Sequence, residues 1–200
     1  MRPATLLVFA KPPRIGLSKT RLAKGLGKAG ARRVAGFTLA RTLAATRASG
    51  CAVTIYLAPD AEVRRQGKHP LFGKLRLRPQ GPGGLTERLG RGFREAPPGP
   101  VLFIGTDAPD ISAARLRQAV RALRRNDAVF GPARDGGFWL FGLHKGPQTR
   151  APFDAVRWSG PHAMEDVWSR LPPRSRIGLL DQLIDIDEVA DWKEWTRRKR

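Results

Sequence analysis

The strongest structural signal in the chain is the segment Val101-Leu102-Phe103-Ile104-Gly105-Thr106-Asp107-Ala108-Pro109-Asp110. Its first part, residues 101–106, is almost continuously apolar, which is typical of a strand covered on both faces of a parallel sheet. Two aspartates follow at the carboxyl end of this predicted strand, and α/β domains bind their ligands at that end of the sheet. The segment therefore predicts a buried strand that carries carboxylates to a ligand site.

The same pattern extends in both directions as short β-rich runs that alternate with helical stretches. Strands are predicted over residues 5–10, 51–58, 75–78, 101–106, 128–132 and 138–143. Helices are predicted over residues 31–48, 85–95, 163–171 and 188–196, together with one that Ser112 caps. This alternation predicts one doubly wound α/β domain over residues 1–200, with a mainly parallel central sheet and helices on both faces.

Length and composition agree with a single globular domain. The chain has 200 residues, of which 41% are hydrophobic and 8% aromatic, and its 22 Gly and 17 Pro follow no period. No apolar run approaches the roughly 18 residues of a membrane span, so we expect a cytoplasmic protein with no membrane-spanning segment. The single cysteine, Cys51, excludes an internal disulfide and a multi-cysteine zinc site.

The charge departs most from an average chain, because 37 Lys and Arg against 17 Asp and Glu give a formal net charge of +20. An anionic partner is therefore expected: nucleic acid, an anionic membrane surface or a phosphorylated substrate. Arg117, Arg121 and Arg124 share one face of a predicted helix and could follow a phosphate backbone. Aromatic residues are not interleaved with this charge, so a solvated face is favoured and nucleic acid is not expected.

A loop rich in Pro, Gly and cations follows the first predicted strand and contains Lys11, Gly16, Lys19 and Arg21. It is not a Walker A loop, because two positions that require glycine hold proline and serine. No Gly-x-Gly-x-x-Gly follows the strand either. Two interpretations stay open: a loop that binds a nucleotide diphosphate through backbone amides and fixed cations, or a solvated basic loop.

Three groups of carboxylates are candidates for a metal or substrate site. Asp107 is a natural ligand for a Mg²⁺ ion that also binds substrate phosphates, although it could instead only shape a turn. Asp135 begins an Asp-Gly-Gly hairpin turn, and its carboxylate could also accept hydrogen bonds from a sugar or acceptor hydroxyl. Asp185 and Asp187 could supply a second metal ligand or favour the N-terminus of the last helix.

In combination, these segments resemble a known family. The matching motifs are Phe9-Ala10-Lys11-x-Pro13-x-x-Gly16-x-x-Lys19-Thr20-Arg21-Leu22, Ile104-Gly105-Thr106-Asp107-x-Pro109-Asp110, Gly131-Pro132-x-x-Asp135-Gly136-Gly137, Trp158-Ser159 and Asp185-x-Asp187. They resemble an uncharacterised family of glycosyltransferase-A fold, commonly labelled as radical-SAM- or selenodomain-associated transferases and sometimes as arsenosugar-type glycosyltransferases. That family is similar in fold to the molybdenum-cofactor and phospholactate guanylyltransferases, which implies a nucleotide-diphospho-sugar transferase architecture over nearly the whole chain.

The resemblance also implies roles for individual residues, with Asp107 and Asp135 as the catalytic carboxylates. Residues near the nucleotide phosphates would be Lys11, Gly16, Lys19 and Arg21. The metal ligands would be Asp107 together with Asp185 or Asp187. The residues that border the acceptor would be Asp135, Gly136, Gly137, Trp158 and Ser159.

The chain departs from the family pattern at a few positions. Ile15 replaces a second proline, Phe138 replaces a tyrosine and Gly160 replaces a threonine. The run Gly84-Leu85-Thr86-Glu87-Arg88-Leu89 replaces Asp-Leu-Gly-Glu-Arg-Met. The lost Asp and Thr affect the acceptor side, whereas the phosphate and metal positions are kept.

The expected function is that of a metal-dependent transferase with Mg²⁺ or Mn²⁺, a nucleotide-sugar or nucleotide donor and an unknown small-molecule acceptor. Glycosyl transfer, which releases a nucleoside diphosphate, is slightly favoured over nucleotidyl transfer, which releases pyrophosphate. A catalytically degenerate basic binding module is the remaining alternative. His69, His144 and His162 are candidates for a general base by residue type only.

Overall fold

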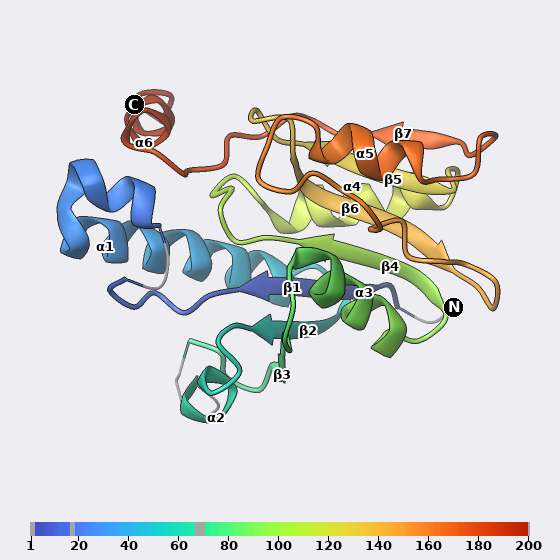
Figure 1. Ribbon diagram of the computed structural model, residues 1–200, viewed down its shortest axis with the longest axis horizontal. Coiled ribbons are helices and arrows are strands. Elements are labelled where there is room, and N and C mark those ends of the chain that lie inside the picture. The colour runs from blue at the N-terminus through green and yellow to red at the C-terminus, as the bar shows by residue number, and fades with distance from the viewer. Residues whose placement is uncertain (1–2, 17–18, 67–70, 200) are drawn as a thin grey trace.

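The computed structural model describes residues 3–16, 19–66 and 71–199 and shows a central sheet with helices on both faces (Figure 1). The strands are β1 (Thr5–Ala10), β2 (Ala52–Leu57), β3 (Arg76–Pro79), β4 (Gly99–Ile104), β5 (Ala128–Pro132), β6 (Phe138–Lys145) and β7 (Ile177–Leu179). The helices are α1 (Thr20–Arg47), α2 (Glu62–Gln66), α3 (Leu85–Glu95), α4 (Ala113–Leu123), α5 (Ala163–Ser169) and α6 (Val189–Arg197). The predicted α/β class is confirmed.

Within the described residues the sheet has seven strands in the order β3-β2-β1-β4-β6-β5-β7. β1 is parallel to β2 and β4, β2 is parallel to β3, and β5 is parallel to β7, whereas β6 is antiparallel to β4 and β5. The sheet is therefore mainly parallel, as predicted. Because the hairpin after β5 reverses the chain, β6 begins at the edge of the sheet where β1, β4 and β5 end.

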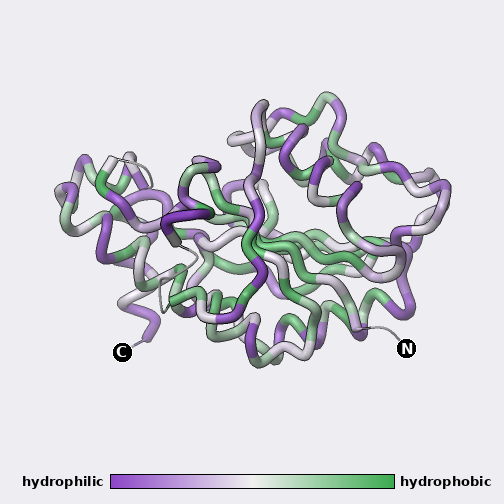
Figure 2. The backbone as a smooth tube through the Cα atoms, turned by 90° about the horizontal axis from the view of Figure 1, so that it is seen from below, coloured by the Kyte–Doolittle hydropathy of each residue, from purple (hydrophilic) through white to green (hydrophobic). Residues whose placement is uncertain are grey.

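Alternating residues of the central strands build two apolar layers. Leu6 and Val8 of β1 belong to the layer that the sheet forms with α1 and α4. Leu7 of β1 and Phe103 of β4 belong to the opposite layer, formed with α3 and α5. Figure 2 shows that hydrophobic residues are concentrated in the central strands, with hydrophilic segments around them. Among the residues described, no helix is both long and apolar enough to cross a membrane.

The element bounds differ from the sequence prediction mainly at the first helix. α1 begins at Thr20 rather than near residue 31, because glycines hide the helical periodicity of its first turns. One of them, Gly27, has φ 70° and ψ 165° and kinks the helix there. The short elements α2 and β7 were not predicted, whereas β1, α3, β5 and the Ser112 cap are found where the sequence placed them.

A third, smaller apolar cluster attaches the C-terminal helix to the rest of the domain. Leu22 and Val34 of α1 pack there with Ile186 and with Trp195 of α6. Ile186 lies in the segment that leads into α6, so this cluster fixes residues 185–187 beside the N-terminal part of α1.

Candidate functional site

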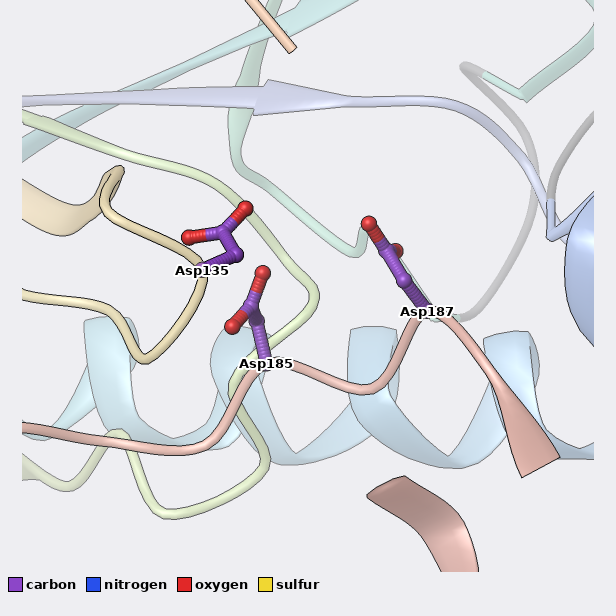
Figure 3. Close-up of side chains that lie close together, drawn as sticks. All are labelled: Asp135, Asp185 and Asp187. Atoms are coloured by element: carbon purple, nitrogen blue, oxygen red, sulfur yellow. The ribbon is translucent and has the colours of Figure 1, made fainter. Parts of the chain in front are cut away.

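Three carboxylates gather where the central strands end. Asp135, Asp185 and Asp187 each offer one oxygen, and these oxygens lie within 4.8 Å of one another (Figure 3). Asp135 comes from the hairpin between β5 and β6, and the other two come from the segment before α6. Carboxylate oxygens are the ligands that Mg²⁺ and Mn²⁺ prefer, so the donor set fits a hard divalent cation.

The hairpin holds Asp135 through its own backbone. The amide of Gly137 donates a hydrogen bond to Oδ1 of Asp135 at 2.9 Å. Gly136 has φ +86°, and a Cβ added there would lie 2.1 Å from the carbonyl oxygen of Pro161. Only glycine fits this position, because both the left-handed backbone and the close approach exclude a side chain. The backbone that approaches Gly136 belongs to this chain's own loop before α5.

The segment 185–187 is aligned by a contact with the end of β4. The amide of Ile186 donates to the carbonyl of Asp107 at 2.9 Å, and the Ile186 side chain is buried in the small apolar cluster. Asp185 and Asp187 flank this anchored residue in an extended segment, so both turn away from the cluster and toward the site. The amide of Asp187 also donates to Asp191 of α6 at 3.1 Å.

Lys19 ties two of the predicted site carboxylates together. Its Nζ lies 2.5 Å from Oδ1 of Asp107 and 3.0 Å from Oδ1 of Asp187, and its side chain is only 4% exposed. Burial acts to lower the pKa of Lys19, but the attraction of Asp107 and Asp187 outweighs it and raises the pKa above its ordinary value. Lys19 is therefore a fixed ammonium group between the end of β4 and the 185–187 segment.

The carboxylates of the cluster repel one another, and Asp185 shows this most clearly. Burial, then repulsion by Asp135 and Asp187, raises the pKa of Asp185 to about 7. A proton on Asp185 relieves the repulsion, and a divalent cation would relieve it more completely because it attracts every carboxylate of the cluster.

Two cavities meet at Asp107 and Asp187. The polar cavity has a volume of about 660 Å³ and is lined by Lys11, Gly16, Lys19, Gln80 and Arg88, among others. The aromatic cavity has a volume of about 360 Å³, and its lining includes Phe9, Leu85, Phe103, Phe138, Trp139 and Trp158. Asp107 and Asp187 line both cavities, whereas Asp135 and Asp185 line the aromatic cavity and not the polar one.

Arg88 and Gln80 are part of the polar cavity, and the sequence did not single them out. Nε of Arg88 donates to the carbonyl of Gly83 at 3.0 Å, and its Nη1 donates to Oε1 of Gln80 at 3.3 Å. Nε2 of Gln80 donates in turn to the carbonyl of Ala10, at the end of β1, at 3.2 Å. The available signal was that Arg88 matches the arginine of the family's Asp-Leu-Gly-Glu-Arg-Met run.

The other predicted site residues are divided between the two cavities. Lys11, Gly16 and Lys19 line the polar cavity, whereas Arg21, Gly137, Trp158 and Ser159 line the aromatic one. Gly136 contacts Pro161 as described above. Of the departures from the family pattern, Phe138 and Gly160 line the aromatic cavity and Gly84 lines the polar cavity.

The candidate histidines take no part in either cavity where the structure describes them. His144 contacts the carbonyl of Leu123 at 2.7 Å, and His162 contacts Glu165 at 3.3 Å. His69 lies outside the described residues.

Solved structures with a similar fold were found. A "putative nucleotide-diphospho-sugar transferase" from Desulfovibrio desulfuricans G20 is 26% identical, with a TM-score of 0.91 over 100% of this chain and 89% of that chain. The 4-diphosphocytidyl-2C-methyl-D-erythritolsynthase from Anaerococcus prevotii DSM 20548 is 13% identical, with a TM-score of 0.64 over 100% and 99%. Rv0371c from Mycobacterium tuberculosis H37Rv, in complex with manganese, is 16% identical, with a TM-score of 0.58 over 96% and 97%. The last two likenesses concern the fold alone.

No curated protein matches the sequence. A family model, in contrast, matches residues 39–160, which include Asp107 and Asp135. Lys19, Asp185 and Asp187 lie outside that range. The chain belongs to the family described as "Uncharacterized protein conserved in bacteria (DUF2064)".

Proposed function

We propose that this protein is a metal-dependent glycosyltransferase that uses a nucleotide-sugar donor and a small-molecule acceptor. The observation that carries the proposal is that Asp187, a member of the carboxylate cluster, lines both the polar cavity and the aromatic cavity. A metal at Asp135, Asp185 and Asp187 would adjoin ligands in both cavities. The similarity to the Desulfovibrio protein and the manganese bound to Rv0371c support this assignment.

The polar cavity suits the nucleotide diphosphate. Lys11 and Arg88 bring positive charge to it, and Arg88 is held in place by Gly83 and Gln80. Oriented cations of this kind bind phosphate oxygens through charge-assisted hydrogen bonds. Lys19 would act through Asp107 and Asp187 by holding these two carboxylates in a fixed position.

A bound divalent cation would supply positive charge that stabilises the departing diphosphate. In the reaction, a hydroxyl oxygen of the acceptor forms a bond to the anomeric carbon, and the bond from that carbon to the diphosphate oxygen breaks. The nucleoside diphosphate leaves with the electron pair. The proton of the acceptor passes to a carboxylate, and the exposed Asp135 is our candidate because it lines the aromatic cavity.

Nucleotidyl transfer is the second candidate, because Asp107 and Asp187 also line the polar cavity where phosphates would bind. In that reaction a hydroxyl or phosphate oxygen attacks the α-phosphorus of a nucleoside triphosphate, and pyrophosphate leaves. The 4-diphosphocytidyl-2C-methyl-D-erythritolsynthase from Anaerococcus prevotii shares the fold. We also propose that the protein is related to the radical-SAM-associated transferases and, more distantly, to the guanylyltransferases that its sequence motifs resemble.

The test is a panel of nucleotide sugars and nucleoside triphosphates, each with and without Mn²⁺ or Mg²⁺. We expect metal-dependent thermal stabilisation by nucleotide sugars, by about 2.7 kcal/mol at a hundred times the dissociation constant. Phosphorus NMR of overnight reactions then identifies the product. Nucleoside diphosphate supports glycosyl transfer, and pyrophosphate supports the second candidate. Stabilisation that does not depend on metal, without turnover of any donor, would overturn both.

A further inference from the structure

The aromatic cavity has the features of a binding site for a flat apolar group. Phe9, Phe138 and Trp158 line this cavity, and all three are only half-buried. Phe138 and Trp158 meet edge to face with ring centroids 6.2 Å apart. A volume of about 360 Å³ lies within the range of small-molecule sites, which are mostly apolar with a few polar groups.

A hydrogen bond from its ring nitrogen orients the tryptophan. Nε1 of Trp158 donates to Oγ1 of Thr86 at 2.8 Å, and Oγ1 of Thr86 donates to the carbonyl of Phe153 at 3.0 Å. The only polar atom of the indole is thereby satisfied within the protein. What Trp158 offers to a ligand is its aromatic surface rather than a hydrogen bond.

The charged lining of this cavity is the carboxylate group together with Arg21. Asp135 and Asp185 line this cavity but not the polar one, so a ligand in this cavity would lie against both carboxylates. The cavity thus combines an aromatic wall with carboxylates that can accept a proton or adjoin a metal.

We infer that the acceptor is a small molecule that carries a hydroxyl on a carbon next to a flat aromatic group, with the ring against Phe138 and Trp158 and the hydroxyl toward Asp135. This inference rests on the proposed function, because it assigns the second substrate of the same site. It adds the chemical class of that substrate, which neither the fold nor the family description supplies.

The first experiment measures binding of 2-naphthylmethanol, with glycerol as the polar comparison, in the presence of Mn²⁺. We expect saturable binding of the naphthyl alcohol and none of glycerol. Replacement Trp158→Leu should weaken binding about three- to tenfold, the range expected for losing one aromatic pair. Trp168→Leu is the matched control, because Trp168 is 39% exposed, stacks on Phe130 and does not line this cavity. Equal binding of the two alcohols, or equal losses in the two variants, would overturn the inference.

A measurement on the unaltered protein covers the case in which Trp158→Leu fails to fold. The chain has five tryptophans, whose indole N–H signals can be followed by NMR. The signal of Trp158 should shift on addition of 2-naphthylmethanol, whereas that of Trp168 should not. A shift spread equally over both would mean non-specific association and would contradict the site.

The second experiment separates this inference from the proposed function. The release of nucleoside diphosphate from an active nucleotide sugar is measured with water, glycerol or 2-naphthylmethanol as acceptor. Acceleration by 2-naphthylmethanol alone, with formation of the naphthylmethyl glycoside, supports the inference. Release to water with no preference between the alcohols leaves the proposed function standing and refutes the aromatic acceptor. Absence of any release while the naphthyl alcohol still binds at Trp158 refutes the glycosyltransferase and keeps the aromatic site.

Discussion

Two lysines of this molecule each contact more than one oxygen atom. The oxygens around Lys19 belong to carboxylates, whereas those around Lys145 belong to backbone carbonyls. Lys19, at the edge of the sheet that carries the site, lies between the carboxylates of Asp107 and Asp187. Lys145, at the end of β6, donates to the carbonyls of Phe93, Arg94 and Ala96 at 2.7, 2.8 and 2.5 Å. Formal negative charge raises the pKa of Lys19, whereas burial lowers the pKa of Lys145.

The difference separates Lys19, at the candidate functional site, from Lys145, which has a structural role. The carbonyls around Lys145 are the free C-terminal carbonyls of α3, so this lysine caps a helix and complements its dipole. Lys19 instead neutralises carboxylates that could also bind a metal or accept a proton. A divalent cation can compete with Lys19 for these oxygens, but it has no comparable role at Lys145.

The largest effect is expected for Asp187→Asn, which removes a carboxylate shared by Lys19 and the acidic cluster. Mn²⁺ affinity should fall by at least about 100-fold, because even the outer partners of metal ligands contribute about 10–100-fold. Titration calorimetry measures it. Asp181→Asn is the matched control, since Asp181 precedes the same segment, is 67% exposed and lies outside the cluster. Unchanged affinity in Asp187→Asn would show that the ion binds elsewhere.

The sequence supplied the parts of this site but not their arrangement. Asp107 was recognisable because an apolar run ends directly before it, and Asp135 because Asp-Gly-Gly between two apolar runs predicts a hairpin. Both expectations depend on local periodicity and turn chemistry. The antiparallel direction of β6 follows from that hairpin, whereas the order of the strands depends on packing between distant segments.

The meeting of Asp135 with Asp185 and Asp187 depends on contacts between residues far apart in the sequence. The bond from the Ile186 amide to the Asp107 carbonyl joins two segments, and the burial of Ile186 against Trp195 turns the aspartates outward. No local pattern encodes either contact. The pairing of Lys19 with two carboxylates was missed for the same reason, since spacing alone could not distinguish a buried lysine from a solvated one.

Lys19→Met should produce the next largest effect. The variant leaves Asp107 and Asp187 facing each other without their cation, and we expect a loss of about 2–3 kcal/mol in the free energy of unfolding at low salt. Removing one partner of a completely buried ion pair costs ~3–5 kcal/mol. The expected loss is smaller here because both carboxylates are half-exposed. Mn²⁺ should restore part of the loss in thermal denaturation followed by circular dichroism. A loss that Mn²⁺ leaves unchanged would mean that metal and lysine do not share these oxygens.

The pKa of Asp185, about 7, gives a smaller and pH-dependent effect. Between about pH 4 and pH 7 the folded protein holds a proton there that the unfolded chain has lost, so this group makes stability fall as the pH rises. At about pH 8 without metal, Asp185→Asn should therefore melt about 2–4 °C above the parent chain. At about pH 4 the two should melt together. Mn²⁺ should reverse the order at about pH 8, and an order independent of pH would exclude a proton on Asp185.

Lys145→Met should give the smallest effect and completes the comparison. It removes the cation that caps α3, and we expect a loss of about 0.5–1 kcal/mol, because water can reach the freed carbonyls near the exposed Arg94. Urea denaturation at matched ionic strength measures it. Unlike the loss in Lys19→Met, this one should be the same with and without Mn²⁺, and Mn²⁺ affinity should equal that of the parent chain. If Mn²⁺ restored stability to Lys145→Met as well, its effect would be a general one of ionic strength. Lys19, which contacts a carboxylate of the candidate metal site, would then respond to Mn²⁺ in the same way as Lys145, which caps a helix.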